Sequence, residues 1–401
     1  MVGYRIAIAL GVLLAVVAGS AIVFTLTSYL PSQSVETGPG NIVPNQPNAL
    51  SKAMVANITV SGYPYEIAAD ASLGKVYVSD TFANKLTVIN ATSYAVLGTI
   101  TLPGTPESGL SVDAANNMVY VPVYDCTNMV NASNNCDYGA RSAGIVEIDG
   151  VSDSIVGEIH IGVDRLAVDA STGVLFGTSS DFLLTIDGKS GSLIANTSLG
   201  AFPLSIAVDS ARDMADVSAC KQPTEMGCIG AELLEINGTS HEVQSVVSLC
   251  SEHGMSCLMN FNVVVNPDTN TVYAAGVNEG DALALISIDG TNGKVRYSSD
   301  LGPSCLGAAG GTVALDVATD MIYASSYIPG GFFLVFNGST GRVINALSDP
   351  AGVQYTAFNS GTGQVYLTME AASEAVGFLV VLPASTNQGQ ISGSASLQGI
   401  C

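Results

Sequence analysis

The stretch that decides the fold is IAADASLGKVYVSD, residues 67–80. An apolar triplet ends at Asp70, a polar turn follows, and a run of β-branched and aromatic residues is centred on Tyr77. The frame occurs seven times, each time with an Asp or Asn at its anchor: Asp70, Asp113, Asp169, Asp209, Asn266, Asp316 and Asn359. Successive anchors lie 40 to 57 residues apart. A fixed period lengthened by insertions is typical of a repeat protein.

Two further features recur in each copy. The residue seven places after the anchor is aromatic except at Asp216: Tyr77, Tyr120, Phe176, Asp216, Tyr273, Tyr323 and Tyr366. A second alternating apolar run then ends at Asn or Asp in six copies and at Pro383 in the seventh: Asn90, Asp149, Asp187, Asn237, Asp289 and Asn337. Gly follows five of these six residues, and such Asx-Gly pairs tolerate positive φ and indicate tight hairpins.

Each copy therefore predicts four antiparallel strands, a to d. Strands a and b meet at the first anchor, strand c ends at the second Asx, and strand d follows, as at residues 96–102. Seven such units predict an all-β, seven-bladed β-propeller of four-stranded antiparallel blades over residues 53–401. An additional strand at residues 56–60 precedes the first copy, and we expect it to complete the seventh blade. Residues 390–397 are the alternative for that place.

The repeat resembles that of a known family. KVYVS at residues 75–79 and NAT at residues 90–92 are similar to the repeats of YVTN-type β-propellers, which occur in archaeal and bacterial surface and secreted proteins. The resemblance covers roughly residues 54–398 and implies the propeller fold. It leaves the function open, because propellers serve as enzymes, binders and scaffolds.

The N-terminal segment predicts a membrane anchor. Residues 6–30 contain no charged side chain and follow Arg5. A helix of this length extends about 37 Å, against a hydrocarbon core of about 30 Å. We therefore expect a transmembrane helix within residues 1–30, with the C-terminal domain outside the cell. A cleaved signal peptide is the alternative, because residues 18–21 (Ala-Gly-Ser-Ala) are small, and the protein would then be secreted. Residues 31–52 form a Pro-, Ser- and Asn-rich linker.

The composition limits the partners and the environment. Net charge is −22, which argues against nucleic acid, because its recognition needs Lys and Arg. Only 11% of the residues are charged, whereas a soluble domain usually has about 25%. The low density of charge predicts an acidic environment, since carboxylates titrate near pH 4.

Eight cysteines predict disulfides, because an even number outside the cytoplasm is usually paired. The expected pairs are Cys126–Cys136, Cys220–Cys228, Cys250–Cys257 and Cys305–Cys401, and crossed pairing among the middle four cysteines is the alternative. The cysteines fall in b–c insertions, in d–a connections or after the last strand. Those connections lie on one face of a propeller, so the sequence predicts a disulfide-stapled face with ordered loops suited to recognition.

Glycosylation is predicted at some of the Asn-x-Ser/Thr sequons. The candidates are Asn57, Asn90, Asn131, Asn196, Asn237 and Asn337. Turns also favour Asn, so Asn90, Asn237 and Asn337 are alternatively turn residues. Asn131, in the longest b–c insertion, is the best candidate.

Two segments have weak metal-binding patterns. His253 and Met255 lie between two cysteines, somewhat like the ligand loop of blue-copper proteins, although a disulfide across that loop is the alternative. Asp125 and Asp137 flank an Asn-rich loop with oxygen ligands that Ca²⁺ accepts, but the Asp-x-Asp-x-Asp-Gly order is absent. We predict no metal and no cofactor.

No catalytic set is identified by the sequence. Gly-x-Ser-x-Gly and Walker motifs are absent, and Glu66, Glu107 and Asp164 near the starts of their a strands are too scattered to nominate. We predict an extracellular, membrane-tethered propeller that acts as a binding or scaffold module, with an envelope protein, a glycan or an identical subunit as partner. The alternative is an extracytoplasmic enzyme of lactonase or lyase type at the channel mouth, or a metal-dependent redox protein.

Overall fold

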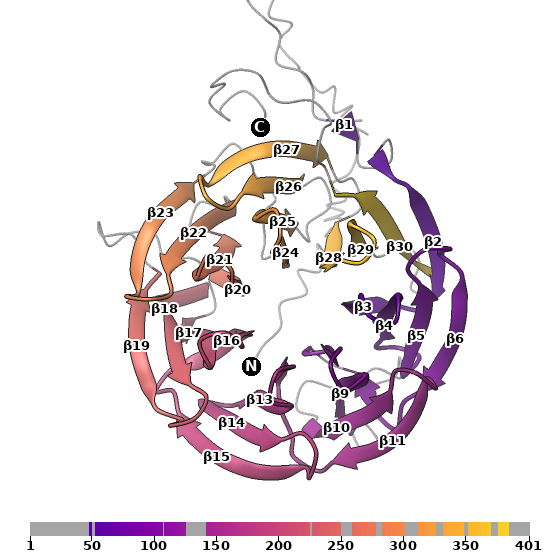
Figure 1. Ribbon diagram of the computed structural model, residues 1–401, viewed down its shortest axis with the longest axis horizontal. Helices are drawn as coiled ribbons and strands as arrows, with labels where there is room; N and C mark the ends of the chain where they lie inside the picture. Colours follow the sequence, from indigo (N-terminus) through magenta and orange to yellow (C-terminus); the bar gives the residue numbers. More distant parts are fainter. Residues whose placement is uncertain are drawn as a thin grey trace, which may run out of the picture. The chain divides into compact units, whose positions relative to one another are not determined.

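Seven β-sheets arranged in a ring make up the described part of this computed structural model (Figure 1). In each blade the first strand lies at the centre of the ring and the last strand at its rim. The prediction of an all-β, seven-bladed propeller with four-stranded antiparallel blades is confirmed. Blades 2 and 6 each have one additional short strand.

The described residues all belong to one of the two units of the chain, residues 46–401. They are residues 48–49, 53–106, 108–125, 142–224, 227–249, 259–277, 283–300, 312–325, 332–348, 352–369 and 376–384. The predicted membrane anchor lies outside these ranges. Within them, no helix is long and apolar enough to cross a membrane.

The first four blades follow the chain from the centre of the ring to its rim. Blade 1 contains β3 (Pro64–Asp70), β4 (Lys75–Asp80), β5 (Lys85–Asn90) and β6 (Val96–Thr101). Blade 2 contains β7 (Thr105–Pro106), β8 (Ser111–Asp113), β9 (Met118–Tyr124), β10 (Ser142–Asp149) and β11 (Ser154–Ile159). Blade 3 contains β12 (Arg165–Asp169), β13 (Val174–Ser179), β14 (Phe182–Asp187) and β15 (Ser192–Ser198). Blade 4 contains β16 (Phe202–Asp209), β17 (Met214–Thr224), β18 (Gly227–Asn237) and β19 (Val243–Ser248).

The last three blades follow the same order, and two of them include strands from the start of the domain. Blade 5 contains β20 (Met259–Asn266), β21 (Thr271–Val277), β22 (Leu283–Asp289) and β23 (Lys294–Asp300). Blade 6 contains β24 (Val313–Asp316), β25 (Met321–Ser325), β26 (Phe332–Asn337), β27 (Arg342–Ser348) and β1 (Asn48–Ala49). Blade 7 contains β28 (Val353–Asn359), β29 (Gln364–Met369), β30 (Val376–Pro383) and β2 (Ala56–Ser61).

The ring closes through β2, which is the outer strand of blade 7. It pairs antiparallel with β30, in a register that runs from Ala56 opposite Val381 to Ser61 opposite Val376. The expectation that residues 56–60 complete the seventh blade is confirmed. The alternative strand, residues 390–397, lies outside the described ranges.

The anchor residues cap the turns between strands. Asp70 Oδ1 accepts hydrogen bonds from the backbone N–H groups of Ser72 and Leu73, at 2.9 and 3.0 Å. The left-handed residue of this turn is Gly74, with φ 61°, four places after the anchor. The Asx-Gly pairs at the ends of the c strands therefore have a different role from the one predicted. In these turns too the positive φ falls four residues after the Asx, as at Asp153, and not at the glycine directly after it.

Those glycines make room for a contact between blades. A Cβ atom on Gly150 would lie 3.0 Å from the hydroxyl of Tyr77 in the preceding blade, and one on Gly338 would lie 2.6 Å from that of Tyr273. The same contact closes the ring, because the Tyr366 hydroxyl donates to the carbonyl oxygen of Ala91, 2.9 Å away. The repeat tyrosines therefore link each of these blades to the next.

Candidate functional site

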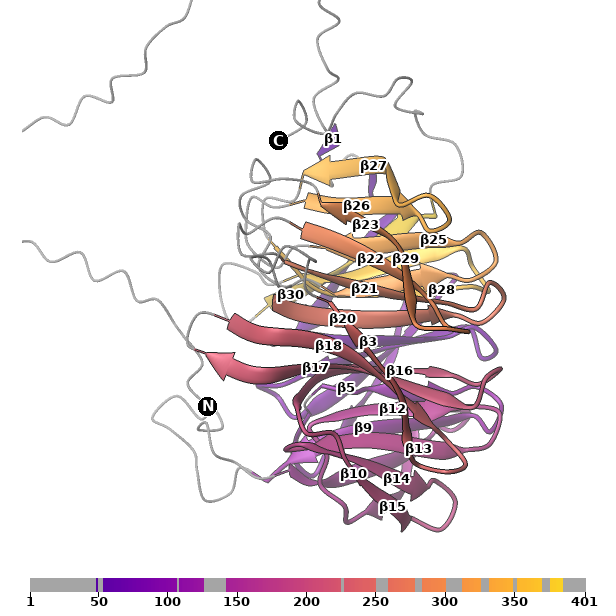
Figure 2. The same ribbon diagram turned by 90° about the vertical axis from the view of Figure 1, so that its left-hand side faces the viewer.

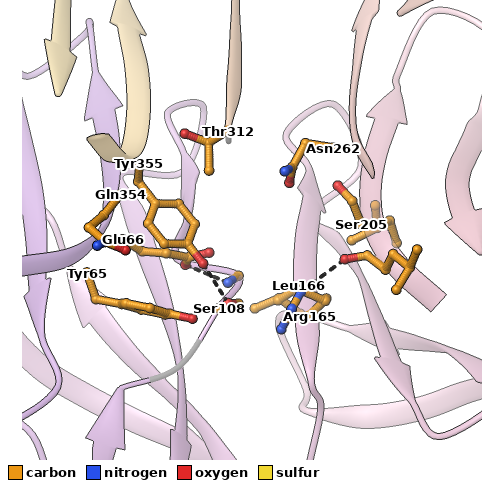
Figure 3. A pocket seen from close by; sticks show the side chains of 13 residues that line it. Tyr65, Glu66, Ser108, Arg165, Leu166, Ser205, Asn262, Thr312, Gln354 and Tyr355 are labelled. Atoms are coloured by element: carbon orange, nitrogen blue, oxygen red, sulfur yellow. Dashed lines mark hydrogen bonds between the residues drawn. The ribbon is translucent and has the colours of Figure 1, made fainter. Parts of the chain in front are cut away.

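A cavity of about 340 Å³ lies in the central channel, and all seven blades contribute to its wall (Figure 3). Its polar lining side chains come from the first half of the inner strands or from the residues just before them. They are Tyr65, Glu66, Ser108, Arg165, Ser205, Asn262, Thr312, Gln354 and Tyr355. We call this cavity the channel pocket.

The inner strands supply this lining because they are buried on one side only. Along β3 the burial repeats every third residue, so that Pro64, Ile67 and Asp70 are buried and the residues between them are half-buried. Tyr65 and Glu66 both line the channel, and they lie where the register of β3 against β4 shifts between Pro64 and Ile67. Arg165 on β12 also lines the channel and is half-buried. Packing between the blades therefore constrains the buried residues of the inner strands. The residues that face the channel are not constrained in this way, and they can differ from blade to blade.

Glu66 connects blade 1 to blade 2. Its carboxylate accepts hydrogen bonds from the backbone N–H groups of Gly109 and Leu110. Gly109 has φ 109°, and a Cβ atom there would lie 2.3 Å from the backbone nitrogen of Leu166 in blade 3. Only glycine therefore allows the three blades to approach at this point, and the carboxylate of Glu66 joins blade 1 to blade 2 there.

Arg165 makes a similar connection between blades 3 and 4. Its Nη1 donates to the carbonyl oxygen of Asp164 at 2.8 Å, and its Nε donates to that of Leu204 at 3.2 Å. Glu66 and Arg165 are the charged side chains that line the pocket, one of each sign. Their opposite formal charges cancel, so the lining of the pocket has no net charge, and the hydrogen bonds to backbone groups hold both side chains in place.

Two tyrosines form one wall of the pocket (Figure 3). The rings of Tyr65 and Tyr355 pack edge to face with centroids 4.8 Å apart, and the Tyr355 hydroxyl lies 3.0 Å from that of Ser108. Burial raises the pKa of Tyr355 well above its usual value, and Tyr65 and Glu66 add to the rise. The phenol is therefore a neutral hydrogen-bonding group with an apolar ring, and not a base.

The rest of the wall is uncharged and polar. Asn262 and Ser205 lie on the side opposite the tyrosines, and Thr312 lies between them (Figure 3). Ser205 Oγ accepts a hydrogen bond from the backbone nitrogen of Val263 at 3.3 Å. Thr312 Oγ1 is buried and has no hydrogen-bond partner within the described part of the chain. Amide and hydroxyl groups of this kind bind other hydroxyl and amide groups.

A long hairpin extends on the same side as the pocket. Ser205 pairs with Ser218, and β17 and β18, which are 11 residues long each, continue past this level to Thr224 and from Gly227. A disulfide joins Cys220 to Cys228 within the hairpin, with Cα atoms 5.6 Å apart. Figure 2 shows β17 and β18 reaching beyond the neighbouring strands. The predicted Cys220–Cys228 bond is therefore present beside the channel mouth.

Most other predicted site residues lie outside the described ranges. These are the disulfides Cys126–Cys136, Cys250–Cys257 and Cys305–Cys401, the metal candidates His253, Met255 and Asp137, the sequon residue Asn131, and Glu107. Asp125 is described, but no group of three His, Cys, Asp or Glu residues in the described ranges is arranged to hold a metal ion. Asp164 accepts hydrogen bonds from the Tyr124 hydroxyl and the Ser180 backbone, at 2.9 and 3.2 Å, and does not line the pocket.

The sequons in the described ranges fall into two groups. Asn57 on β2 and Asn196 on β15 are exposed on outer strands. Asn90, Asn237 and Asn337 cap turns, because the Oδ1 atom of each accepts backbone N–H groups within the next three residues. The alternative interpretation of these three residues as turn residues is therefore confirmed. It does not bear on whether they also carry a glycan.

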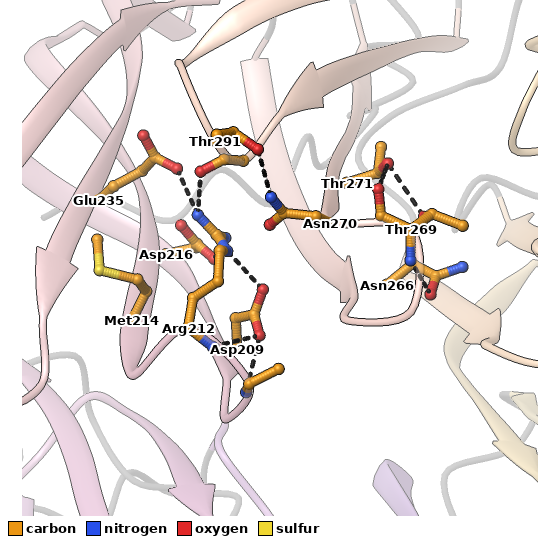
Figure 4. A network of polar contacts seen from close by, with 12 residues as sticks. Asp209, Arg212, Met214, Asp216, Glu235, Asn266, Thr269, Asn270, Thr271 and Thr291 are labelled. Carbon is orange, nitrogen blue, oxygen red and sulfur yellow. Dashed lines mark hydrogen bonds and ion pairs between the residues drawn. The ribbon is translucent and has the colours of Figure 1, made fainter.

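A second polar cluster lies between blades 4 and 5, where Asp216 replaces the repeat tyrosine (Figure 4). The Arg212 guanidinium donates to the carboxylates of Asp209 at 2.6 Å, Asp216 at 3.1 Å and Glu235 at 3.1 Å. It also donates to the carbonyl oxygen of Gly290, the residue after the c-strand Asx in blade 5. Arg212 therefore makes the contact that a tyrosine makes at other junctions.

The electrostatics of this cluster are unusual. Asp216 is completely buried, and burial raises its pKa to about 8 against the opposing effect of Arg212, with Glu235 and Asp209 adding to the rise. The break in the aromatic pattern at Asp216 was the available sequence signal. Sequence reasoning recorded the break but missed Arg212, because the arginine belongs to the adjacent turn and not to the repeated positions.

Comparison with known proteins supports the fold and goes no further. The chain matches a structure of hydrazine synthase from Kuenenia stuttgartiensis with a TM-score of 0.64 and 12% identity, over 90% of this chain and 100% of that one. It matches the β-propeller domain of Cps50 (Swd1) from Myceliophteria thermophila with a TM-score of 0.60 and 8% identity, over 80% and 99% of the two chains. The fold is a β-propeller. No protein-family model and no curated protein sequence matches the chain.

Proposed function

We propose that the protein is a YVTN-type extracellular propeller, tethered by its N-terminal segment, that binds a component of the cell envelope at the channel mouth. The observation that carries this proposal is the channel pocket, which all seven blades line and beside which the disulfide-bonded β17–β18 hairpin extends. A concave site with convergent polar groups on a rigid ring is the usual form of a ligand site. The tether rests on residues 6–30, which are apolar and uncharged.

The chemistry of the pocket favours a glycan as the ligand. Asn262, Gln354, Ser205 and Thr312 offer amides and hydroxyls, and Tyr65 offers an aromatic ring. Sugars present hydroxyl groups around an apolar ring face and match such a wall. An envelope protein could use the same mouth, but the neutral interior gives a charged side chain no net attraction.

The test uses the full-length chain in detergent and polysaccharide purified from the envelope of the source cells. The double variant N262A/Q354A should bind at least tenfold more weakly than the wild type, because two amide groups are removed from the wall. The matched control is Q244A, an exposed amide on β19 outside the channel, which should bind like the wild type. Unchanged binding by N262A/Q354A would contradict the proposal.

The location is tested separately by fractionation of the source cells. We expect the full-length chain in the membrane fraction and a chain that lacks residues 1–30 in the soluble fraction, because the uncharged segment is removed. Protease added to intact cells should digest the propeller. A protected propeller would contradict the extracellular location while leaving the glycan site untouched.

The enzyme alternative is tested at Glu66. Its carboxylate already accepts two backbone N–H groups, which supports a structural role. We expect lactones and envelope polysaccharides to remain intact when they are incubated with the wild type. Turnover that is lost in E66Q, with the fold preserved by circular dichroism, would favour the enzyme instead.

A further inference from the structure

Two aromatic side chains of blade 1 pack on each other outside the channel pocket. The rings of Tyr63 and Phe82 have centroids 4.9 Å apart and are tilted by 32°. Phe82 is 37% exposed, and it is the only exposed aromatic side chain in the described ranges. We call these two residues the aromatic pair. Apolar residues scattered singly over a surface are ordinary, but an aromatic pair next to a pocket is typical of a ligand site.

The aromatic pair is continuous with the wall of the channel pocket. Tyr63 lies in the connection from β2 to β3, and Phe82 lies in the turn from β4 to β5. These two segments meet at the start of β3, where Pro64 is opposite Asp80. Tyr65, two residues after Tyr63, lines the pocket (Figure 3). The Cα atoms of the two tyrosines are at most about 7 Å apart, because an extended residue spans no more than about 3.6 Å.

A buried carboxylate fixes the backbone of both aromatic residues. Asp80 is 2% exposed, and its Oδ1 atom accepts hydrogen bonds from the backbone nitrogens of Tyr63 and Phe82, both at 3.1 Å. It also accepts the backbone nitrogen of Ala83 at 3.0 Å. Gly62 has φ 74°, and a Cβ atom there would collide with the Asp80 carboxylate. The backbone of the aromatic pair is therefore held in place before a ligand binds, which lowers the entropy cost of binding.

The fold does not require an aromatic residue at this turn, as the equivalent turn of blade 3 shows. The turn from β13 to β14 contains Ser180 and Asp181, which are both polar and exposed. An acid bonds that turn as well, because Asp164 accepts the backbone nitrogen of Ser180 at 3.2 Å. The contact between an acid and the turn thus occurs in both blades, whereas the exposed ring occurs in blade 1. Packing of the fold does not explain Phe82.

We propose that the aromatic pair is a second subsite for the glycan of the channel pocket. The ligand is then an oligosaccharide of at least two sugar rings that extends from the pocket across blade 1. This inference rests on the proposed function. Sugar rings have a face of C–H groups that packs on aromatic rings, and Phe82 offers an exposed ring of this kind. The Asp80 carboxylate is buried, so the subsite, like the pocket, suits a neutral ligand.

The first test compares a short ligand with a longer one on the full-length chain in detergent. A monosaccharide and an oligosaccharide, both released from neutral envelope polysaccharide, are titrated and followed by ligand-observed NMR. F82A should bind the oligosaccharide about tenfold more weakly than the wild type and the monosaccharide equally well, because only the longer ligand reaches the pair. N262A/Q354A should weaken both. The matched control is L97A, an exposed apolar residue on the outer strand β6, which should bind like the wild type.

A second test places a fluorescent reporter at the subsite. The chain contains no tryptophan, so F82W introduces a single one. Its emission should change saturably with the oligosaccharide. Addition of N262A/Q354A to the same chain should raise the midpoint of this change at least tenfold, because one ligand occupies the pocket and the pair together. The control L97W should show no change in emission.

The outcomes separate this inference from the function on which it rests. If neither sugar binds the wild type, both the proposed function and the subsite are overturned. If both sugars bind and F82A leaves the affinity for the oligosaccharide unchanged, the subsite alone is overturned. An F82W signal whose midpoint does not respond to N262A/Q354A would show a separate site, and it would overturn the single ligand that spans the two.

Discussion

Neighbouring blades are joined in two ways, and the comparison shows how one contact can be built from different chemistry. At the junction of blades 7 and 1, the neutral hydroxyl of Tyr366 donates to Ala91. At the junction of blades 4 and 5, the charged guanidinium of Arg212 donates to the equivalent carbonyl, that of Gly290. The geometry is kept, but the second junction needs buried carboxylates to balance its cation. The stability of the junction between blades 4 and 5 therefore depends on pH, whereas that of the tyrosine junctions does not.

The largest effect is expected from R212M. This change leaves the buried carboxylates of Asp209 and Glu235 without their cation and removes the donor to Asp216, which its raised pKa keeps mostly protonated at pH 7. Breaking a buried ion cluster costs about 3–5 kcal/mol of unfolding free energy. Denaturant unfolding at pH 7 measures the loss. The matched control is R296M, which removes a partly exposed pair with Asp289 and should cost about 1 kcal/mol or less. Equal losses of unfolding free energy in the two variants would show that the Arg212 cluster is not the main stabilising contact between blades 4 and 5.

The pH dependence of stability should separate the two kinds of junction next. Because the pKa of Asp216 is raised to about 8 in the folded state, the folded protein holds a proton that the unfolded chain releases near pH 4. The contribution of this bound proton to the unfolding free energy is complete below about pH 4, and it is lost as the pH rises to about 8. The wild type should therefore lose stability over this range, as measured by thermal unfolding.

The variant D216N isolates this effect, because an amide keeps the hydrogen-bond acceptor for Arg212 but cannot titrate. Its stability should change less than that of the wild type between pH 4 and pH 8. Parallel curves for the two proteins would exclude Asp216 as the titrating group. A wild type that unfolds at pH 3 and is most stable near neutral pH would also contradict the acidic environment predicted from composition.

A smaller effect is expected from Y366F. Removal of the hydroxyl leaves the buried Ala91 carbonyl without this donor, and an unsatisfied buried group costs about 1–3 kcal/mol. Y77F is the matched comparison. The Gly150 carbonyl also receives the Lys75 ammonium at 2.6 Å, so Y77F should cost less than Y366F. Denaturant unfolding measures both losses of free energy. A larger loss in Y77F than in Y366F would show that the hydroxyl hydrogen bond does not determine the stability of the junction.

Most of the fold could be predicted from the sequence because it repeats. The anchors Asp70 and Asn359 end β3 and β28 as expected, and the strand at residues 56–60 closes the ring. The position of positive φ was misplaced, because Asx-Gly pairs are common in two-residue hairpins and these turns are longer. The glycine after the Asx is explained by the tyrosine hydroxyl of another blade, which local reasoning does not see.

The candidate site was much harder to predict. Glu66 appeared among scattered acids, and neither Arg165 nor Asn262 belongs to a motif. These residues converge only because ring closure brings the starts of the inner strands of all seven blades to one axis (Figure 1). Each position differs from blade to blade, so the periodicity that identifies the fold carries no information about the pocket.

We propose that the channel pocket binds a neutral glycan, and calorimetric titration tests this binding most directly. Neutral oligosaccharides released from the envelope would be titrated into the full-length chain and into N262A/Q354A. We predict saturable binding of one molecule per chain, at least tenfold weaker in the variant. The affinity should be equal at low and high salt, because screening weakens only charged contacts. Binding that is absent, unaffected by the variant or steeply weakened by salt would contradict the account.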